Sequence, residues 1–200
     1  MLVIALETGS LPGGGMRWAG RRHDDDRPDA SSGSSSAALF DAVFHALHDG
    51  EQVALGFDCA LTMPAPSGRD PASDPADADA LVTLAEPVAG RPGLAELGHL
   101  LGELGTWRPW TTVSTSLTRW KANTSILVWQ AVPPPGAAGV AASAAADSFF
   151  RHFPGATEGA TDADAGTVVN LAAAAARRAG LFVDATELAR PTVSITVTGG

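Results

Sequence analysis

Two acidic residues stand where two apolar runs of the sequence end. Glu7 follows the run 2–6, and Asp58 follows the run 53–57. Short continuous apolar runs with β-branched members, followed by turn-forming residues, predict buried strands. In an open α/β sheet the carboxyl ends of the strands border the ligand crevice. We therefore expect the carboxylates of Glu7 and Asp58 to converge at one edge of a sheet.

Two further acids, Asp162 and Asp164, stand at the start of the segment 161–180, which we predict to be a helix with acids at its N-terminus. Carboxylate oxygens are the ligands of hard cations such as Mg²⁺ or Mn²⁺. A pair of such ions activates water and stabilises the leaving oxygen of a phosphodiester. These two acids, with Glu7 and Asp58, are therefore candidate metal ligands. The structural alternative is that all of them order turns or cap helices.

The remaining sequence alternates between periodic segments and segments rich in Gly, Pro, Ser and Asp. Apolar residues spaced by three and four predict helices, and alternating or β-branched runs predict strands. The predicted strands are 2–6, 16–20, 53–57, 125–132 and 192–198. The first predicted helix is capped by Ser36 and ends at residues 49–50, and the other predicted helices are 94–105, 141–153 and 161–180. This order predicts a single α/β domain over 1–200, with a mixed five-stranded sheet and flanking helices.

Two segments interrupt the periodic pattern. Residues 21–36 combine aspartates with a Ser/Gly tract, so we expect a mobile surface loop without a strand. Residues 63–92 are rich in Pro, Asp, Ala and Gly. Because this stretch is long for a structureless loop, we interpret it as an insertion or lid.

These features resemble the ribonuclease H-like superfamily. The resemblance rests on an acid-tipped strand in a hairpin over 2–20, a helix, a second acid-tipped strand with the sequence Gly-Phe-Asp-Cys-Ala-Leu-Thr-Met-Pro over 56–64, a further strand, and a late helix that opens with Asp-Ala-Asp-Ala at 162–165. Within the superfamily the chain is most similar to an uncharacterised bacterial family of predicted nucleases. In that family an Asp after the central strand precedes a short apolar segment containing proline.

The resemblance implies a ribonuclease H-like sheet and metal-dependent cleavage of nucleic-acid phosphodiesters. It implies that Glu7, Asp58 and Asp164 are catalytic metal ligands and that Asp162 is a fourth ligand. The cofactor implied is Mg²⁺ or Mn²⁺. The first position is Glu here, where the superfamily generally has Asp, which moves the carboxylate outward by one methylene.

Three residues are candidates for contact with the substrate. Arg17 belongs to the basic cluster near Glu7, where a guanidinium could contact a phosphate. Trp107 neighbours Arg108, and an indole beside a guanidinium is typical of surfaces on which bases stack. The simpler interpretation of each is an exposed hairpin face for Arg17 and ordinary packing for the tryptophan.

Three weaker motifs remain. The glycine-rich stretch 9–15 could cradle phosphates as in actin-like ATPases, although no Walker lysine follows it and a flexible hairpin loop is the simpler interpretation. Cys59 could be a nucleophile, but no histidine adjoins it and a buried small residue is favoured. His45 and His48 lie three apart on a predicted helix without a Glu-x-x-His set, which favours surface histidines.

Composition narrows the class of protein. The formal net charge of −9 opposes polybasic binding of nucleic acid, but not a metal-mediated contact with a phosphodiester. A single cysteine excludes an internal disulfide, and the first apolar run is too short for a signal peptide or a membrane span. We therefore expect a cytoplasmic protein that does not bind membranes.

Three functional hypotheses follow. The first is a metal-dependent nuclease acting through the acidic residues. The second is a catalytically inactive ribonuclease H-like subunit that docks a protein partner through the segment 107–120 or through the Pro-rich insertion. The third is an actin-like nucleotide-binding module that uses the loop 9–15.

Overall fold

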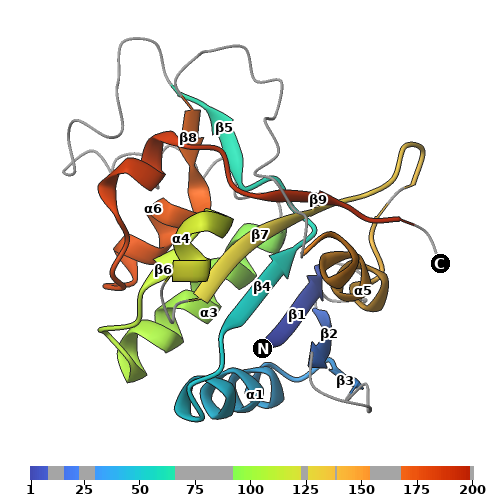
Figure 1. Cartoon of the computed structure of the whole chain (residues 1–200), viewed down its shortest axis with the longest axis horizontal. Helices are drawn as coiled ribbons and strands as arrows, with labels where there is room; N and C mark the ends of the chain where they lie inside the picture. The colour runs from blue at the N-terminus through green and yellow to red at the C-terminus, as the bar shows by residue number, and fades with distance from the viewer. Residues whose placement is uncertain are drawn as a thin grey trace.

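A computed structural model describes residues 1–8, 16–22, 30–65, 92–122, 126–137, 139–153 and 168–198. The strands are β1 (Leu2–Glu7), β2 (Arg17–Arg22), β3 (Ala30–Gly33), β4 (Val53–Phe57), β5 (Thr62–Pro64), β6 (Val113–Ser114), β7 (Ile126–Val132), β8 (Val168–Asn170) and β9 (Ser194–Thr196). The helices are α1 (Ser36–His48), α3 (Pro92–Trp107), α4 (Leu117–Ala122), α5 (Ala142–His152), α6 (Leu171–Arg178) and the 3₁₀ helix η2 (Ala185–Ala189). A mixed sheet flanked by helices (Figure 1) confirms the predicted α/β class.

The main sheet has the strand order β3-β2-β1-β4-β7-β6, and β9 also pairs with β7. The first three strands form an antiparallel meander, whereas β1, β4 and β7 run parallel to one another. The sheet has seven strands instead of the predicted five, because the short strands β3 and β6 join it. A separate two-stranded sheet pairs β5 with β8. The parallel strands β1 and β4 lie side by side and end at the same edge.

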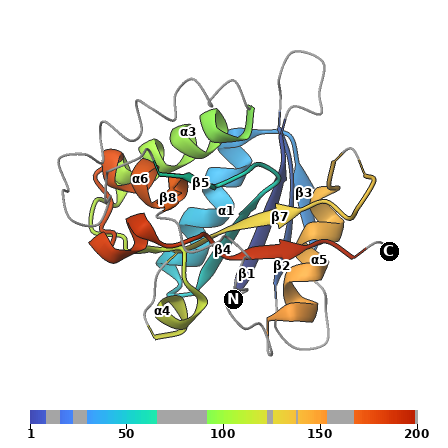
Figure 2. The same ribbon diagram turned by 90° about the horizontal axis from the view of Figure 1, so that it is seen from above.

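Each face of the sheet is covered by its own set of helices (Figure 2). Along β1, Leu2, Ile4 and Leu6 pack with α1, α3 and α6, whereas Val3 and Ala5 pack with α4 and α5. This alternation is what the pleat of a strand buried on both faces requires. In the described residues, no helix is both long and apolar enough to span a membrane.

The segment 21–36 differs from the expected loop. Residues 21–22 complete β2, and residues 30–33 form β3, which pairs antiparallel with β2. The close packing explains why the strand consists of small residues. A Cβ at Gly33 would lie 3.1 Å from the ring of Trp18, and a Cβ at Gly20 would lie 2.6 Å from the hydroxyl of Ser31. The Ser/Gly composition therefore serves pairing with β2, which the pattern of the segment alone does not reveal.

The late helix begins later than predicted. Helix α6 starts at Leu171, with Asn170 as its N-cap, and residues 168–170 form β8. Asp162 and Asp164 lie outside the described residues and do not begin the helix, which corrects the expectation that placed them in its first turn. The side chain of Asn170 accepts a hydrogen bond from the backbone N–H of Ala173 at 3.0 Å. Asn170 therefore fulfils the capping role that we expected of the acids.

The helix α1 is confirmed with a shift of one residue at its start. Ser35, and not Ser36, is the N-cap, and its hydroxyl accepts from the N–H of Ala38 at 3.4 Å. Gly50 has a φ of 75°, a conformation that favours glycine and ends the helix there. The predicted hairpin partner, the strand after α1 and the strand over 126–132 are also confirmed.

Candidate functional site

Asp58 is held at the carboxyl edge of the sheet by the residue that follows β1. The backbone N–H of Thr8 donates to both carboxylate oxygens of Asp58, at 3.2 and 3.1 Å, and the Thr8 hydroxyl donates to Oδ1 at 2.5 Å. The parallel pairing of β1 with β4 brings these residues together, because Leu6 lies opposite Phe57 in the register. The carboxylate is thus fixed by two donors from one residue of the neighbouring strand end.

The electrostatics of Asp58 are those of a carboxylate kept partly away from water. Burial raises its pKa above the ordinary value, the hydrogen bonds from Thr8 oppose that rise, and the nearby charge of Glu7 adds to it. Among the described residues, neither Glu7 nor Asp58 has an ion-pair partner. Two neighbouring carboxylates that form no ion pair are a suitable arrangement for a bound metal ion.

The turn after Asp58 is held in place by hydrogen bonds to the backbone of Leu61. The backbone N–H of Leu61 donates to Oε1 of Gln130 at 3.2 Å. Its carbonyl oxygen accepts from the N–H of Leu171 at 2.9 Å and from the hydroxyl of Thr192 at 3.2 Å. Gln130 lies on β7 opposite Phe57. Its neutral amide, which offers an acceptor to a backbone N–H, holds the turn that carries Asp58.

A buried polar network extends this anchor. The amide of Asn170 donates to the hydroxyl of Thr115 at 2.9 Å and to the carbonyl of Arg190 at 2.9 Å, and its oxygen accepts from the hydroxyl of Thr192 at 3.0 Å. Glu187, which is 2% exposed, accepts from the hydroxyls of Ser114 and Thr115, both at 2.8 Å. Sequence reasoning missed this network. Only the position of Asn170 just before an Ala-rich helical run signals part of it.

Helix α3 connects the two edges of the sheet. At its start, a Cβ at Gly93 would lie 2.6 Å from the sulfur of Cys59 and 3.0 Å from the hydroxyl of Thr8. The start of α3 therefore packs against the carboxylate region, and only glycine fits there. Cys59 is a buried thiol with 9% exposure, which agrees with the interpretation of a buried small residue.

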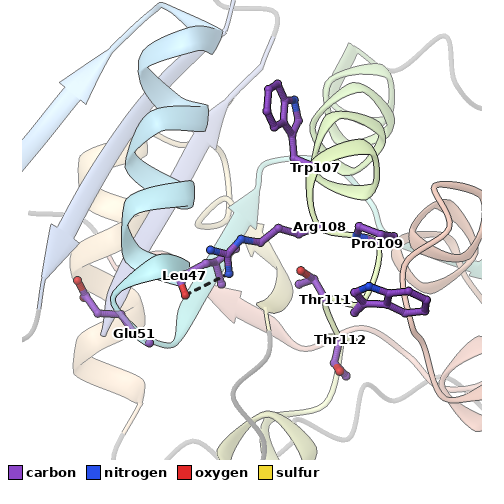
Figure 3. A pocket seen from close by; sticks show the side chains of 9 residues that line it. Leu47, Glu51, Trp107, Arg108, Pro109, Thr111 and Thr112 are labelled. Atoms are coloured by element: carbon purple, nitrogen blue, oxygen red, sulfur yellow. Dashed lines mark hydrogen bonds between the residues drawn. The ribbon is translucent and has the colours of Figure 1, made fainter.

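The other end of α3 carries Trp107, and Arg108 follows it, at the opposite edge. The guanidinium of Arg108 donates to the carbonyl oxygen of Leu47, near the end of α1, at 3.3 Å (Figure 3). Helix α1 precedes β4 along the chain, so this edge is where the strands begin. The expected substrate residues are therefore divided: Arg17 is the register partner of Glu7 at the carboxyl edge, and Trp107 and Arg108 lie at the amino edge.

The complete set of predicted ligands is not gathered in the part of the chain that the structure describes. Within that part, no three His, Cys, Asp or Glu side chains form a metal-binding group. Glu7 and Asp58 are brought together, whereas Asp162 and Asp164 lie outside it, as does the glycine-rich loop 9–15. Two carboxylates nevertheless match the way in which proteins hold Mg²⁺, with one or two acids and the other positions left to water and phosphate.

Comparison with known proteins assigns no family, because no family model, curated protein or solved structure matches this chain. The candidate site therefore stands on the contacts of Glu7, Thr8 and Asp58 alone.

Proposed function

We propose that the protein is a metal-dependent nuclease of ribonuclease H-like architecture, which cleaves nucleic-acid phosphodiesters at Glu7 and Asp58. One observation carries the proposal. The two carboxylates stand at the ends of neighbouring parallel strands, where burial and, to a smaller extent, the charge of Glu7 raise the pKa of Asp58, and among the described residues neither carboxylate forms an ion pair.

The strand arrangement supports the architecture. The resemblance to the ribonuclease H-like superfamily implies an antiparallel meander, then a helix, then parallel strands. The strands β1, β2 and β3 form such a meander, α1 follows it, and β4 and β7 are parallel to β1. The strand β3 supplies the meander strand for which the sequence pattern offered no candidate.

Glu7 and Asp58 are the residues that would hold Mg²⁺ or Mn²⁺. When bound, such a cation polarises the phosphoryl oxygen and makes an attacking water more acidic. Asp162 and Asp164 are proposed as further ligands on the basis of the resemblance. Arg17, opposite Glu7 in the hairpin register, is proposed to contact the substrate phosphate because its guanidinium matches phosphate geometry.

The chain itself contributes position and charge. Thr8 holds the Asp58 carboxylate by its backbone N–H and its hydroxyl, so that the oxygens are oriented before any ligand arrives. These hydrogen bonds also favour the ionised form, against the effect of burial. Gln130 fixes the following turn through Leu61. Together these contacts provide the support that metal-binding carboxylates need for a fixed geometry.

The test is cleavage of labelled single-stranded DNA, single-stranded RNA and an RNA–DNA hybrid, in Mg²⁺ and in EDTA. We expect cleavage only with the cation, and a loss of about 100-fold or more in Asp58→Asn and Glu7→Gln. Asp41→Asn is the matched control, because Asp41 is an exposed acid on α1, outside the site. Cleavage by Asp58→Asn at the rate of Asp41→Asn would overturn the proposal, as would cleavage that persists in EDTA.

A further inference from the structure

The large exposed apolar side chains of the described residues gather at one end of the molecule. They are Trp107, Trp110 and Phe182, with exposed fractions of 71%, 90% and 66%. Phe182 belongs to the same region as the tryptophans, because its N–H donates to the carbonyl of Thr111 at 3.1 Å. A cluster of exposed apolar side chains marks a binding surface, whereas a single exposed apolar residue is common on any protein.

A cleft of about 540 Å³ opens beside the two tryptophans, between the end of α1 and the turn that follows α3 (Figure 3). Its lining includes Leu47, Glu51, Arg108, Trp110, Thr111 and Thr112. The volume falls within the range of small-ligand sites, roughly 300–1,000 Å³. The carbonyl of Thr112 accepts from the N–H of Ile126, the first residue of β7. The cleft therefore lies at the edge where the strands begin, away from Glu7 and Asp58.

Arg108 is the feature that gives this cleft a ligand preference. Its guanidinium is half-buried and crosses toward α1, where it donates to the carbonyl of Leu47. In the described part of the chain, this is the one hydrogen bond of the guanidinium. A guanidinium has five N–H donors in a planar fork. Most of them remain available to a ligand in the cleft.

The charge of the cleft favours an anion despite the net negative charge of the chain. Glu51 is the acidic residue of the lining, and it forms an ion pair with Nε of Arg22 at 3.2 Å. Its charge is therefore compensated by a cation outside the cleft. Arg108 has no acidic partner among the described residues.

We propose that this cleft binds a nucleotide, with the base stacked on the indole of Trp110 and the phosphate held by Arg108. Indole faces accept any base, and a guanidinium binds phosphate oxygens through two parallel hydrogen bonds. The hydroxyls of Thr111 and Thr112 offer further polar contacts. A purely apolar partner would leave the remaining N–H donors of Arg108, beyond the one bound to Leu47, without an acceptor, which is why a nucleotide is the occupant that we infer.

The proposal does not depend on the nuclease proposal, because the cleft and the carboxylates lie at opposite edges of the sheet. A free nucleotide and the terminal nucleotide of a strand share the chemistry that Arg108 and Trp110 recognise. Titration with both ligands distinguishes the two sources. Tighter binding of the oligonucleotide assigns the cleft to a strand end, and tighter binding of the mononucleotide assigns it to a free ligand.

The test is titration of the full chain with AMP, adenosine, inorganic phosphate and a short oligodeoxyadenylate, followed by calorimetry and tryptophan fluorescence. Trp18, Trp120 and Trp129 are buried and supply a constant background, so that the exposed indoles report binding. AMP is expected to bind at least about tenfold tighter than adenosine or phosphate alone, because it uses both contacts. Trp110→Ala and Arg108→Lys are each expected to weaken AMP binding by about tenfold or more.

Three controls keep the result interpretable. Arg151→Ala removes an exposed guanidinium on α5, which packs on the other face of the sheet, and is expected to bind AMP like the wild type. Asp58→Asn is expected to bind AMP normally without Mg²⁺, which separates this site from the carboxylates. Far-UV circular dichroism of Arg108→Lys and Trp110→Ala, compared with the wild type, tests whether each variant is folded. Equal binding of AMP and phosphate, unchanged binding in Trp110→Ala, or loss of binding in Asp58→Asn would each overturn the proposal.

Discussion

The two edges of the main sheet carry opposite kinds of chemistry. At the carboxyl edge, Asp58 is partly buried, fixed by Thr8 and repelled by Glu7. At the amino edge, Trp107 and Trp110 are exposed beside the guanidinium of Arg108. The same helix, α3, contacts both edges, since its start packs against Cys59 and its end carries Trp107. The candidate substrate residues therefore belong to two different sites. The direction of α3 places Trp107 and Arg108 at the amino edge, whereas Arg17 lies at the carboxyl edge.

The first prediction separates the edges by function. Asp58→Asn is expected to lose cleavage by about 100-fold or more and to keep AMP binding, whereas Trp110→Ala is expected to keep cleavage of a short substrate and lose AMP binding. Cleavage rates and calorimetric titrations of both variants provide the measurement. If Trp110→Ala loses cleavage of the short substrate, the two edges form one functional unit and the comparison fails.

The second prediction concerns the support behind the carboxyl edge. Asn170→Ala removes hydrogen bonds to Thr115, Arg190 and Thr192 and the cap of α6, and Asn170 itself is fully buried. We expect the free energy of unfolding to fall by about 3 kcal/mol, because buried partners are left unsatisfied. Denaturant unfolding measures it. Trp110→Ala, at the exposed edge, is expected to change stability by less than about 0.5 kcal/mol.

The third prediction contrasts Asp58 with a structural acid. Asp184 caps η2, donors from Thr186 and then Arg119 lower its pKa from 3.8 to about 2, and it forms an ion pair with Arg119 at 2.8 Å. A carboxyl whose pKa is lowered by folding stabilises the folded state when the pH is above its pKa in the unfolded chain. This stabilisation is lost as the pH falls through about 2, the pKa of Asp184 in the folded state. Asp184→Asn is therefore expected to destabilise the protein at pH 7 by about 1 kcal/mol or less.

Ionisation of Asp58 is expected to lower the stability of the fold, which is the opposite of the effect of Asp184. Because its pKa is raised in the folded state, its contribution to stability is lost as the pH rises through that pKa. Asp58→Asn is therefore expected to melt at a higher temperature than the wild type at pH 7 without metal. Melting curves of Asp184→Asn, Asp58→Asn and the wild type between pH 3 and pH 7 test both predictions. If Asp58→Asn melts lower than the wild type at pH 7, its carboxylate is structural.

The sequence predicted the residues whose position follows from local pattern. Glu7 and Asp58 were located because apolar runs end at them, and pairing of parallel strands then brings them together. The strand β3 was missed because its small residues suit close packing against β2 and not their own burial. The acids at 162 and 164 were assigned to a helix start by charge, although Asn170 is the cap.

The roles of other site residues depend on contacts that are distant along the chain. Thr8 and Asp58 lie 50 positions apart, and Gln130 and Leu61 lie 69 positions apart. No local pattern distinguishes a Gln that accepts from a backbone N–H from one on a surface. The direction of α3, which assigns Trp107 and Arg108 to the amino edge, likewise follows from packing between elements and not from the spacing of residues.

The most direct test of the central claim is thermal unfolding of the full chain with increasing Mg²⁺. A cation bound by Glu7 and Asp58 in the folded state alone must stabilise it, by about 2.7 kcal/mol at 100 times its Kd. We predict a rise in Tm of about 5 °C or more for the wild type and for Asp41→Asn. Asp58→Asn and Glu7→Gln should show none. An equal rise in Asp58→Asn, or no rise in the wild type, would contradict the assignment of this edge as a metal site.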